Sequence, residues 1–241
     1  MNTPELSIIL PVVNEADIIK PVVLEIEKVL VPLNIDYEII LVENESTDHT
    51  WTVLKEMEEK NKRIRAVKTK QGYGSAVLCG IRNARNKYVC YMPSDGQIDP
   101  DILPRLWQEI GNGSYDVVKI KRANRESILR WIQSKTFNLI ARTVYGIRIR
   151  DINGSPRIVA LDSLRKLHLI STDSFIDTEF AIKAHHLGWK IREIPMTNLP
   201  RVGGVSTVHV GTIVEFLRHL VSYRFSPNLA EWKRSQPQHI E

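Results

Sequence analysis

Cysteine and long apolar runs are both scarce in this chain of 241 residues. The two cysteines, Cys79 and Cys90, lie in apolar surroundings and are too few for the disulfide framework of a secreted domain. No run approaches the ~20 apolar residues that cross a bilayer, and the first residues, MNTPELS, do not combine a basic region with a long apolar one. We therefore expect reduced thiols in a cytoplasmic protein whose contact with a membrane, if any, is peripheral.

Linkers, repeats and low-complexity tracts are absent as well, so the sequence predicts a single domain over residues 1–241. Its 43% apolar and 25% charged residues are ordinary for a globular protein. The net charge of +5 suits nucleotides, lipid phosphates, an anionic membrane surface or nucleic acid, and it also suits plain solubility. Because no aromatic-stacking or helix-turn-helix pattern accompanies the charge, we expect no nucleic-acid partner.

Apolar and amphipathic segments alternate through the first hundred residues. Buried strands are predicted for the apolar runs 6–13, 37–42, 64–67 and 88–92, with amphipathic helices after the first three. This alternation calls for right-handed crossovers and a parallel sheet. We therefore predict an α/β fold with a mostly parallel central sheet flanked by helices.

The second half of the chain is less regular. Its pattern predicts helices at 100–110, 127–145 and 178–187, and strands at 116–120, 158–160 and 190–195. An amphipathic stretch at 212–225 then precedes a polar tail. That stretch either packs on the core or binds a membrane surface, and we favour core packing.

Polar loops follow the predicted strands of the first half, at the rim where ligands bind in open parallel sheets. Acidic groups follow the second and fourth strands, and small residues follow the third, which together describe a nucleotide crevice. In the fourth loop, the oxygens of Asp95 and Gln97 are suitable ligands for a hard divalent cation that carries phosphates. The same loop residues also suit a plain turn that caps the next helix.

Six short motifs follow one another between Leu6 and Ser206. They are LPVVNEAD, ENESTDHT, QGYGSAVLCGIRNA, YMPSDGQIDPD, DINGSPRIV and IREIPMTNLPRVGGVS. In this order they resemble the family 2 glycosyltransferases with the GT-A fold, and most closely their dolichol-phosphate mannose synthase-like branch. The resemblance implies that residues 1–110 bind the nucleotide sugar, that residues 111–210 face the acceptor, and that residues 211–241 form a C-terminal amphipathic helix and tail.

The resemblance implies transfer of a sugar from a nucleoside diphosphate sugar, with inversion at the anomeric carbon. The acceptor would be a polyprenyl phosphate or a small-molecule or glycan hydroxyl, and the residues leave this choice open. Glu43 stands in the place of the acid that recognises the base, although Asn44 and Glu45 depart from the family's D-D-x pattern. The substrate-binding residues implied in the donor half are Pro11, Asn14, Glu15, Glu43, Lys68, Gly72, Gly74 and Ser94.

The metal loop of the family corresponds to PSDGQ in this chain. Asp95 and Gln97 match its second acidic and glutamine positions, and a magnesium or manganese ion held there would stabilise the diphosphate leaving group, which makes Asp95 a catalytic residue. Pro93 takes the first acidic position and cannot ligate, so the need for a metal is uncertain. The groups that would compensate are Asp99 and His209 as ligands, or Lys68 and Arg201 as cations.

On the acceptor side, Asp177 and Glu179 stand where many inverting relatives keep a carboxylate that acts as a base. Both also suit the start of a helix, Asp177 as its cap and Glu179 in its first turn. An ionised phosphate acceptor would need no strong base. Arg157 and Arg201 suit a bidentate phosphate clamp, and both also suit an ordinary surface position.

Other functions fit the first loop less well. A nucleotidyltransferase or a dinucleotide-dependent dehydrogenase should carry a glycine-rich loop after its first strand, and PVVNEAD has none. The non-enzyme alternative is a degenerate glycosyltransferase-like domain that binds a nucleotide sugar without turnover, and Pro93 is its best argument.

Overall fold

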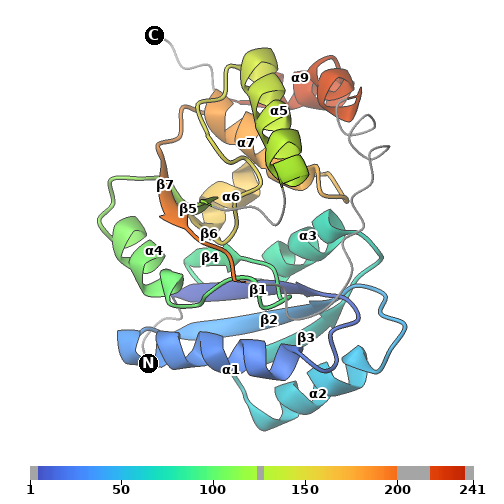
Figure 1. Ribbon diagram of the computed structural model, residues 1–241, viewed down its shortest axis with the longest axis vertical. Helices are drawn as coiled ribbons and strands as arrows, with labels where there is room; N and C mark the ends of the chain where they lie inside the picture. Colours follow the sequence, from blue (N-terminus) through green and yellow to red (C-terminus); the bar gives the residue numbers. More distant parts are fainter. Residues whose placement is uncertain (1–4, 124–127, 200–217, 237–241) are drawn as a thin grey trace.

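The computed structural model describes residues 5–123, 128–199 and 218–236, and a single sheet runs through it (Figure 1). Its seven strands lie in the order β3-β2-β1-β4-β6-β5-β7. They are β1 (Leu6–Val12), β2 (Tyr37–Glu43), β3 (Ile64–Lys68), β4 (Tyr88–Tyr91), β5 (Val117–Arg122), β6 (Arg157–Ala160) and β7 (Ile191–Met196).

The sheet is mostly parallel, as predicted. Strands β1 to β4 pair in parallel, and so do β5 and β7. Only β6 runs against its neighbours, and it lies between β4 and β5. The carboxyl ends of β1 to β4 therefore share one rim, where the four predicted polar loops begin.

Helices cover both faces of the sheet (Figure 1). One face is packed by α1 (Ile19–Leu30), α2 (Thr50–Lys60) and α4 (Ile102–Gly111), with a short 3-10 turn, η1 (Val31–Leu33), after α1. The other face is packed by α3 (Tyr73–Asn83), α5 (Ile128–Tyr145), α6 (Leu161–Lys166) and α7 (Ile176–His186). Strand β1 shows why: Ile8 and Leu10 point into the first layer and Ile9 into the second, so an unbroken apolar run serves both.

The end of the chain differs from the prediction. The residues predicted as a polar tail form a helix, α9 (Pro227–Ser235), whose Leu229 and Trp232 are buried. Ser226 caps it, because its Oγ accepts a hydrogen bond from the Leu229 amide. Of the predicted amphipathic stretch, residues 218–224 are helical and bury Leu220 and Tyr223, as expected for core packing, while residues 212–217 lie outside the described part.

Membrane-spanning length is also tested by the structure. Within residues 5–123, 128–199 and 218–236, no helix is both long enough and apolar enough to cross a bilayer.

Candidate active site

The loops after β1 and β2 are tied to each other at the rim. Asn14 has left-handed backbone (φ 53°), which its residue type tolerates, and its Oδ1 accepts a hydrogen bond from the Thr47 amide at 2.8 Å. The Glu15 amide donates to Thr50 Oγ1 at 2.9 Å. Asp48 Oδ1 accepts a hydrogen bond from the amide of Thr50, the first residue of α2, whose N-cap residue is His49. Asn14 and Glu15, both predicted to bind substrate, thus also shape the first two loops.

A pocket of about 550 Å³ opens between the ends of β2 and β3. Glu43, the last residue of β2, is 4% exposed, and its Oε1 accepts a hydrogen bond from the Ser46 amide at 2.5 Å. The Lys68 ammonium lies 4.4 Å from the centroid of the Trp51 ring, a cation–π contact that restrains a flexible side chain. The lining residues are Glu43, Glu45, Ser46, Lys68, Thr69 and Lys70. Carboxylates and ammonium groups side by side suit a nucleobase, which presents both donors and acceptors.

Gly72 and Gly74, both predicted to bind substrate, join the two halves of the fold. A Cβ added at Gly72 would lie 2.3 Å from the carbonyl oxygen of Thr172, and one at Gly74 would lie 2.3 Å from that of Ser171. The Ser75 amide also donates to Thr172 O at 2.9 Å. The structure therefore gives the glycines a packing role, because only residues without a side chain let α3 touch this segment. Their contact with substrate stays a prediction.

The loop after β4 is attached to the carboxyl end of β1. Ser94 Oγ donates to the carbonyl oxygen of Pro11 at 2.5 Å, and Asp95 Oδ1 accepts from the Gln97 amide at 3.1 Å. No group of three or more His, Cys, Asp or Glu side chains suited to a metal occurs in the part of the chain that the structure describes. Asp95 and Gln97 still fit a cation that takes its remaining ligands from water and substrate phosphates.

Two residues predicted to assist this loop cannot be placed. His209 and Arg201 lie outside the described residues. Their roles as metal ligand and phosphate clamp stay predictions.

Arg157 and Asp177 form a buried ion pair on the α3 and α7 side of the sheet. Arg157 Nη2 lies 2.9 Å from Asp177 Oδ1, and the two side chains are 0% and 8% exposed. The guanidinium lies between the rings of Tyr91 and Phe180, 4.9 and 5.1 Å from their centroids. Burial raises the pKa of Asp177, against the opposing effect of Arg157. Arg157 is therefore not a surface arginine.

The predicted helix cap is also corrected at this point. Helix α7 begins at Ile176, so Asp177 lies in its first turn and does not cap it. The N-cap residue is Phe175, which makes no side-chain cap hydrogen bond, and Asp173 shapes the turn before it, because its Oδ1 accepts a hydrogen bond from the Phe175 amide at 2.9 Å. Asp177 turns instead toward Arg157, and the pair supplies charge compensation inside the protein.

Glu179 is fully buried and heavily bonded. Its carboxylate accepts hydrogen bonds from the amides of Ile170 and Ser171, from the Lys183 ammonium at 2.6 Å and from the Tyr223 hydroxyl at 3.2 Å. These bonds join α7 to the preceding loop and to the helical residues 218–224. The structure thus gives Glu179 a clear structural use, and its predicted catalytic role remains untested.

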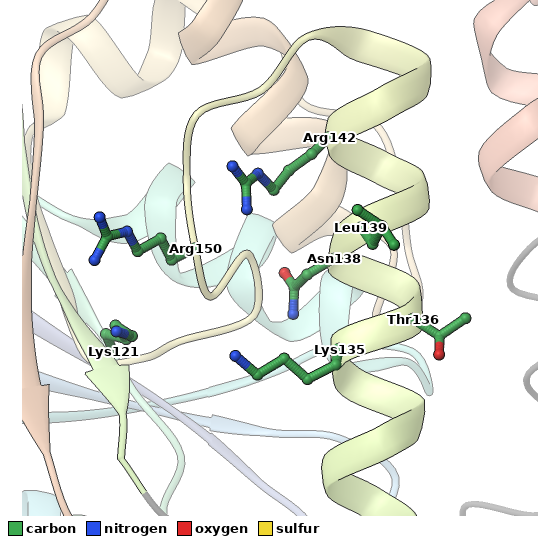
Figure 2. A pocket seen from close by; sticks show the side chains of 7 residues that line it. All are labelled: Lys121, Lys135, Thr136, Asn138, Leu139, Arg142 and Arg150. Carbon is green, nitrogen blue, oxygen red and sulfur yellow. The ribbon is translucent and has the colours of Figure 1, made fainter.

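A second pocket, of about 530 Å³, was not predicted from the sequence (Figure 2). It lies between β5, α5 and the loop that precedes β6, and no acidic residue is among its described lining residues. Figure 2 shows the ends of Lys135 and Arg142 extending from α5 toward the loop, whereas the end of Arg150 extends from the loop on the side away from α5. Its lining residues are Lys121, Lys135, Thr136, Asn138, Leu139, Arg142 and Arg150. Four cations around one space favour a multiply charged anion such as phosphate.

Residues 7–167 match the family model for "Glycosyl transferase family 2". This chain belongs to glycosyl transferase family 2. The glycosyltransferase is 30% identical over 228 residues to a dolichol-phosphate mannosyltransferase of Pyrococcus furiosus, an alignment that covers 90% of this chain but only 62% of that relative. It is 27% identical over 205 residues to an uncharacterized glycosyltransferase of Mycobacterium bovis, covering 84% of this chain and 88% of the relative.

The fold of this glycosyltransferase also matches solved structures. A glucosyl-3-phosphoglycerate synthase from Mycobacterium tuberculosis, in complex with Mn²⁺, UDP and glucosyl-3-phosphoglycerate, superposes with a TM-score of 0.70 at 16% identity, over 92% of this chain and 80% of that one. A complex of the same enzyme with Mg²⁺ and UDP gives a TM-score of 0.68 at 17% identity, over 92% and 79%. The predicted GT-A fold and family are confirmed.

The predicted site residues of the glycosyltransferase that the structure describes lie in three places. The rim of β1, β2 and β4 brings together Pro11, Asn14, Glu15, Glu43, Ser94, Asp95 and Gln97, with Lys68 at the end of the adjacent β3. Gly72 and Gly74 lie at the start of α3, and Arg157, Asp177 and Glu179 are buried in the second half. The sequence signal for the missed pocket was the spacing of Lys135, Asn138 and Arg142, which are three and four residues apart on one helix.

Proposed function

We propose that this chain transfers a sugar from a nucleoside diphosphate sugar to an acceptor that carries a phosphate. The observation that carries the proposal is the cationic pocket, which would hold a phosphate on the acceptor half of the fold. The name of the Pyrococcus relative contains a dolichol phosphate, and the Mycobacterium enzyme has been crystallised with phosphoglyceric acid. Both names support a phosphorylated acceptor without deciding which one this chain uses.

The donor base would bind in the pocket between β2 and β3. One oxygen of Glu43 accepts the Ser46 amide, and the carboxylate is suited to accept a ring N–H of the base as well. Lys68, restrained on Trp51, and Lys70 would donate to base carbonyls or to the ribose. This set favours uracil or guanine, which present an N–H beside a carbonyl, over adenine, whose ring nitrogens are acceptors.

The diphosphate would lie across the loops after β1 and β4. Ser94 holds the loop after β4 against the end of β1, and Asp95 and Gln97 would bind a magnesium or manganese ion whose other ligands are phosphate oxygens and water. A bound cation would neutralise the charge that develops on the departing diphosphate. Because Pro93 provides no ligand, we expect the ion to bind more tightly with the nucleotide than without it.

The transfer itself needs little from the protein beyond positioning. A phosphate oxygen of the acceptor attacks the anomeric carbon as the bond from that carbon to the donor diphosphate breaks, and the diphosphate leaves with the bonding electrons. An acceptor phosphate is already ionised at neutral pH, so no side chain has to remove a proton. Lys135, Arg142 and Arg150 would offset the repulsion between the acceptor phosphate and the donor diphosphate.

Calorimetric titration would test the donor site. We would titrate UDP, GDP and their sugars with and without manganese into the wild type, Asp95→Ala, Glu43→Gln and the exposed control Asp162→Ala. We expect one diphosphate to bind in a metal-dependent way, with affinity lost in the first two variants and kept in the control. Binding that ignores both metal and Asp95 would favour the second candidate function, a nucleotide-sugar-binding domain without turnover, for which Pro93 is the supporting observation.

Turnover assays would test the acceptor site. We expect sugar transfer to a polyprenyl phosphate or a small phosphorylated acceptor, and none to the matching alcohol. Lys135→Ala and Arg142→Ala should each raise the acceptor KM roughly tenfold, because each removes a charge-assisted contact worth about 1.5 to 3 kcal/mol, part of which water replaces. Arg148, an exposed arginine that is not part of the pocket lining, provides the matched control variant Arg148→Ala.

A further inference from the structure

The loop at residues 150–154 forms one wall of the cationic pocket, and its main chain is held by side chains from several elements. The amides of Arg150 and Asp151 donate to the two carboxylate oxygens of Glu193, at 2.9 and 2.8 Å. The Ile152 amide donates to Asn138 Oδ1 at 2.9 Å. Because Arg150 and Asn138 also line the pocket, the shape of this loop sets the shape of the anion site.

Lys119 binds the other side of the same loop. It is 0% exposed on β5, and its ammonium donates hydrogen bonds to the carbonyl oxygens of Asp151 and Ile152, the latter at 3.4 Å. The loop lies directly on the strand, because a Cβ added at Gly154 would come within 2.3 Å of Ile120 O and 3.0 Å of Lys119 Nζ. Lys119 is thus the contact between β5 and the wall of the pocket.

Charged groups surround Lys119 on all the elements packed against it. Arg157 on β6 is its register partner, Arg122 lies on its own strand, and Asp151, Glu193 and Asp177 face it from the loop, β7 and α7. Asp151 already binds Arg122 through both carboxylate oxygens, at 2.9 and 2.8 Å, and Asp177 pairs with Arg157. An apolar side chain would fill this space without the cost of removing a charge from water. Packing alone therefore does not explain why a lysine occupies this position.

We propose that Lys119 is a positioning residue of the acceptor pocket, which fixes the loop at 150–154 and thereby holds Arg150 and Asn138 around the bound phosphate. The inference rests on the proposed function, because it takes the cationic pocket as the acceptor site. Lys119 does not line the pocket, so its effect on anion binding runs through the loop. Donor binding, at the rim of β1 to β4, should be independent of it.

The proposal has a pH dependence. Burial lowers the pKa of Lys119 to about 7, with Arg157 adding to this effect and Asp151 and Glu193 opposing it. The ammonium is therefore charged below pH 7 and neutral above it, and a neutral amine donates weaker hydrogen bonds to the two carbonyls. Anion affinity should fall as the pH rises through 7. Burial lowers the pKa of His185 and of His186, so these two side chains titrate on the acid side of this range.

Sulfate is a suitable probe, because its charge stays constant from pH 6 to 8.5. We would titrate sulfate, and separately the nucleoside diphosphate, into the wild type, Lys119→Met and Lys135→Ala. We expect Lys119→Met to weaken sulfate binding about tenfold at pH 6.5, since two charge-assisted hydrogen bonds to the loop are lost, and to leave nucleotide binding within about twofold. The wild type should lose sulfate affinity between pH 6 and 8.5, and Lys119→Met should not.

The outcomes separate the two proposals. If the wild type does not bind sulfate, or Lys135→Ala binds it as well as the wild type, the acceptor pocket is wrong and the role of Lys119 falls with it. If Lys135→Ala weakens sulfate binding while Lys119→Met does not, the pocket stands and the role of Lys119 is refuted. Should Lys119→Met fail to fold, Lys119→Leu takes its place, and sulfate affinity in that variant equal to that of the wild type at pH 6.5 refutes the role of Lys119.

Discussion

The buried ammonium of Lys119 should make the protein more stable as the pH rises above 7. Burial lowers the pKa of this group from its ordinary value of 10.5 to about 7. Between these two values the unfolded chain binds a proton at this position that the folded protein does not bind, so the free energy of unfolding increases with pH. The cost of burying the lysine is greatest below pH 7 and is relieved as the pH approaches 10.5.

The magnitude follows from the two pKa values. One proton of difference changes the free energy of unfolding by about 1.36 kcal/mol per pH unit, so burying the lysine costs about 4 kcal/mol at pH 7. Between pH 7 and 8.5 the protein should recover about 1.5 to 2 kcal/mol of this. The variant Lys119→Met has no ammonium to bury and should not show the gain.

Urea denaturation at several pH values between 7 and 8.5 would measure this gain in unfolding free energy. Burial also lowers the pKa of Lys183 and of Lys233. Because both proteins contain these lysines, their contributions cancel in the difference in unfolding free energy between the wild type and Lys119→Met. The range ends at 8.5 because burial raises the pKa of Cys90 to about 12, which makes higher pH destabilising. Stability curves that run parallel for the two proteins would refute the reasoning, because they would mean that Lys119 keeps its ordinary pKa when folded.

Three further predictions concern the packing of the second half. Gly74→Ala should cost about 1 to 3 kcal/mol of unfolding free energy, because its Cβ would overlap main-chain oxygens of the facing segment. The control Gly111→Ala meets nothing within 4 Å and should cost far less. Equal losses of the two variants in urea denaturation would argue against the contact. Asp177→Asn should cost about 3 to 5 kcal/mol, since it leaves Arg157 buried without a counter-charge, and a loss below 1 kcal/mol would mean that the pair does not form. Trp232→Ala should lower stability by about 3 to 5 kcal/mol, and an unchanged thermal midpoint would place α9 off the core.

The sheet could be predicted because its apolar runs are contiguous and the connections are regular. The runs at β1 and β2 are buried on both faces, as expected for strands between two helical layers. The rim residues followed from strand ends alone. Glu43 ends β2, and Asn14 and Asp95 lie in the loops that follow β1 and β4; parallel pairing brings these ends together.

The remaining features depend on tertiary contacts that no local pattern records. Lys119 and Arg157 occupy strand positions like any exposed charged residue, and only the loop and helix laid over them bury them. The cationic pocket draws on three separate elements, and only the fold brings Lys121 and Arg150 to the lining residues of α5. Helix α9 has only two buried side chains, Leu229 and Trp232, among polar residues. So few apolar positions do not make a helical pattern, and the sequence therefore predicted a polar tail.

The position of β6 has a consequence for engineering this protein. Because β6 pairs with β4 on one side and β5 on the other, the two parts of the sheet are joined only by a strand that begins at residue 157. A fragment ending near residue 110 would expose the edge of β4, with the ladder groups of Val89 and Tyr91 unpaired, and exposed edges of this kind promote aggregation. An exchange of acceptor specificity between relatives should therefore move the loop at 150–154 and the facing side of α5 and leave β6 in place.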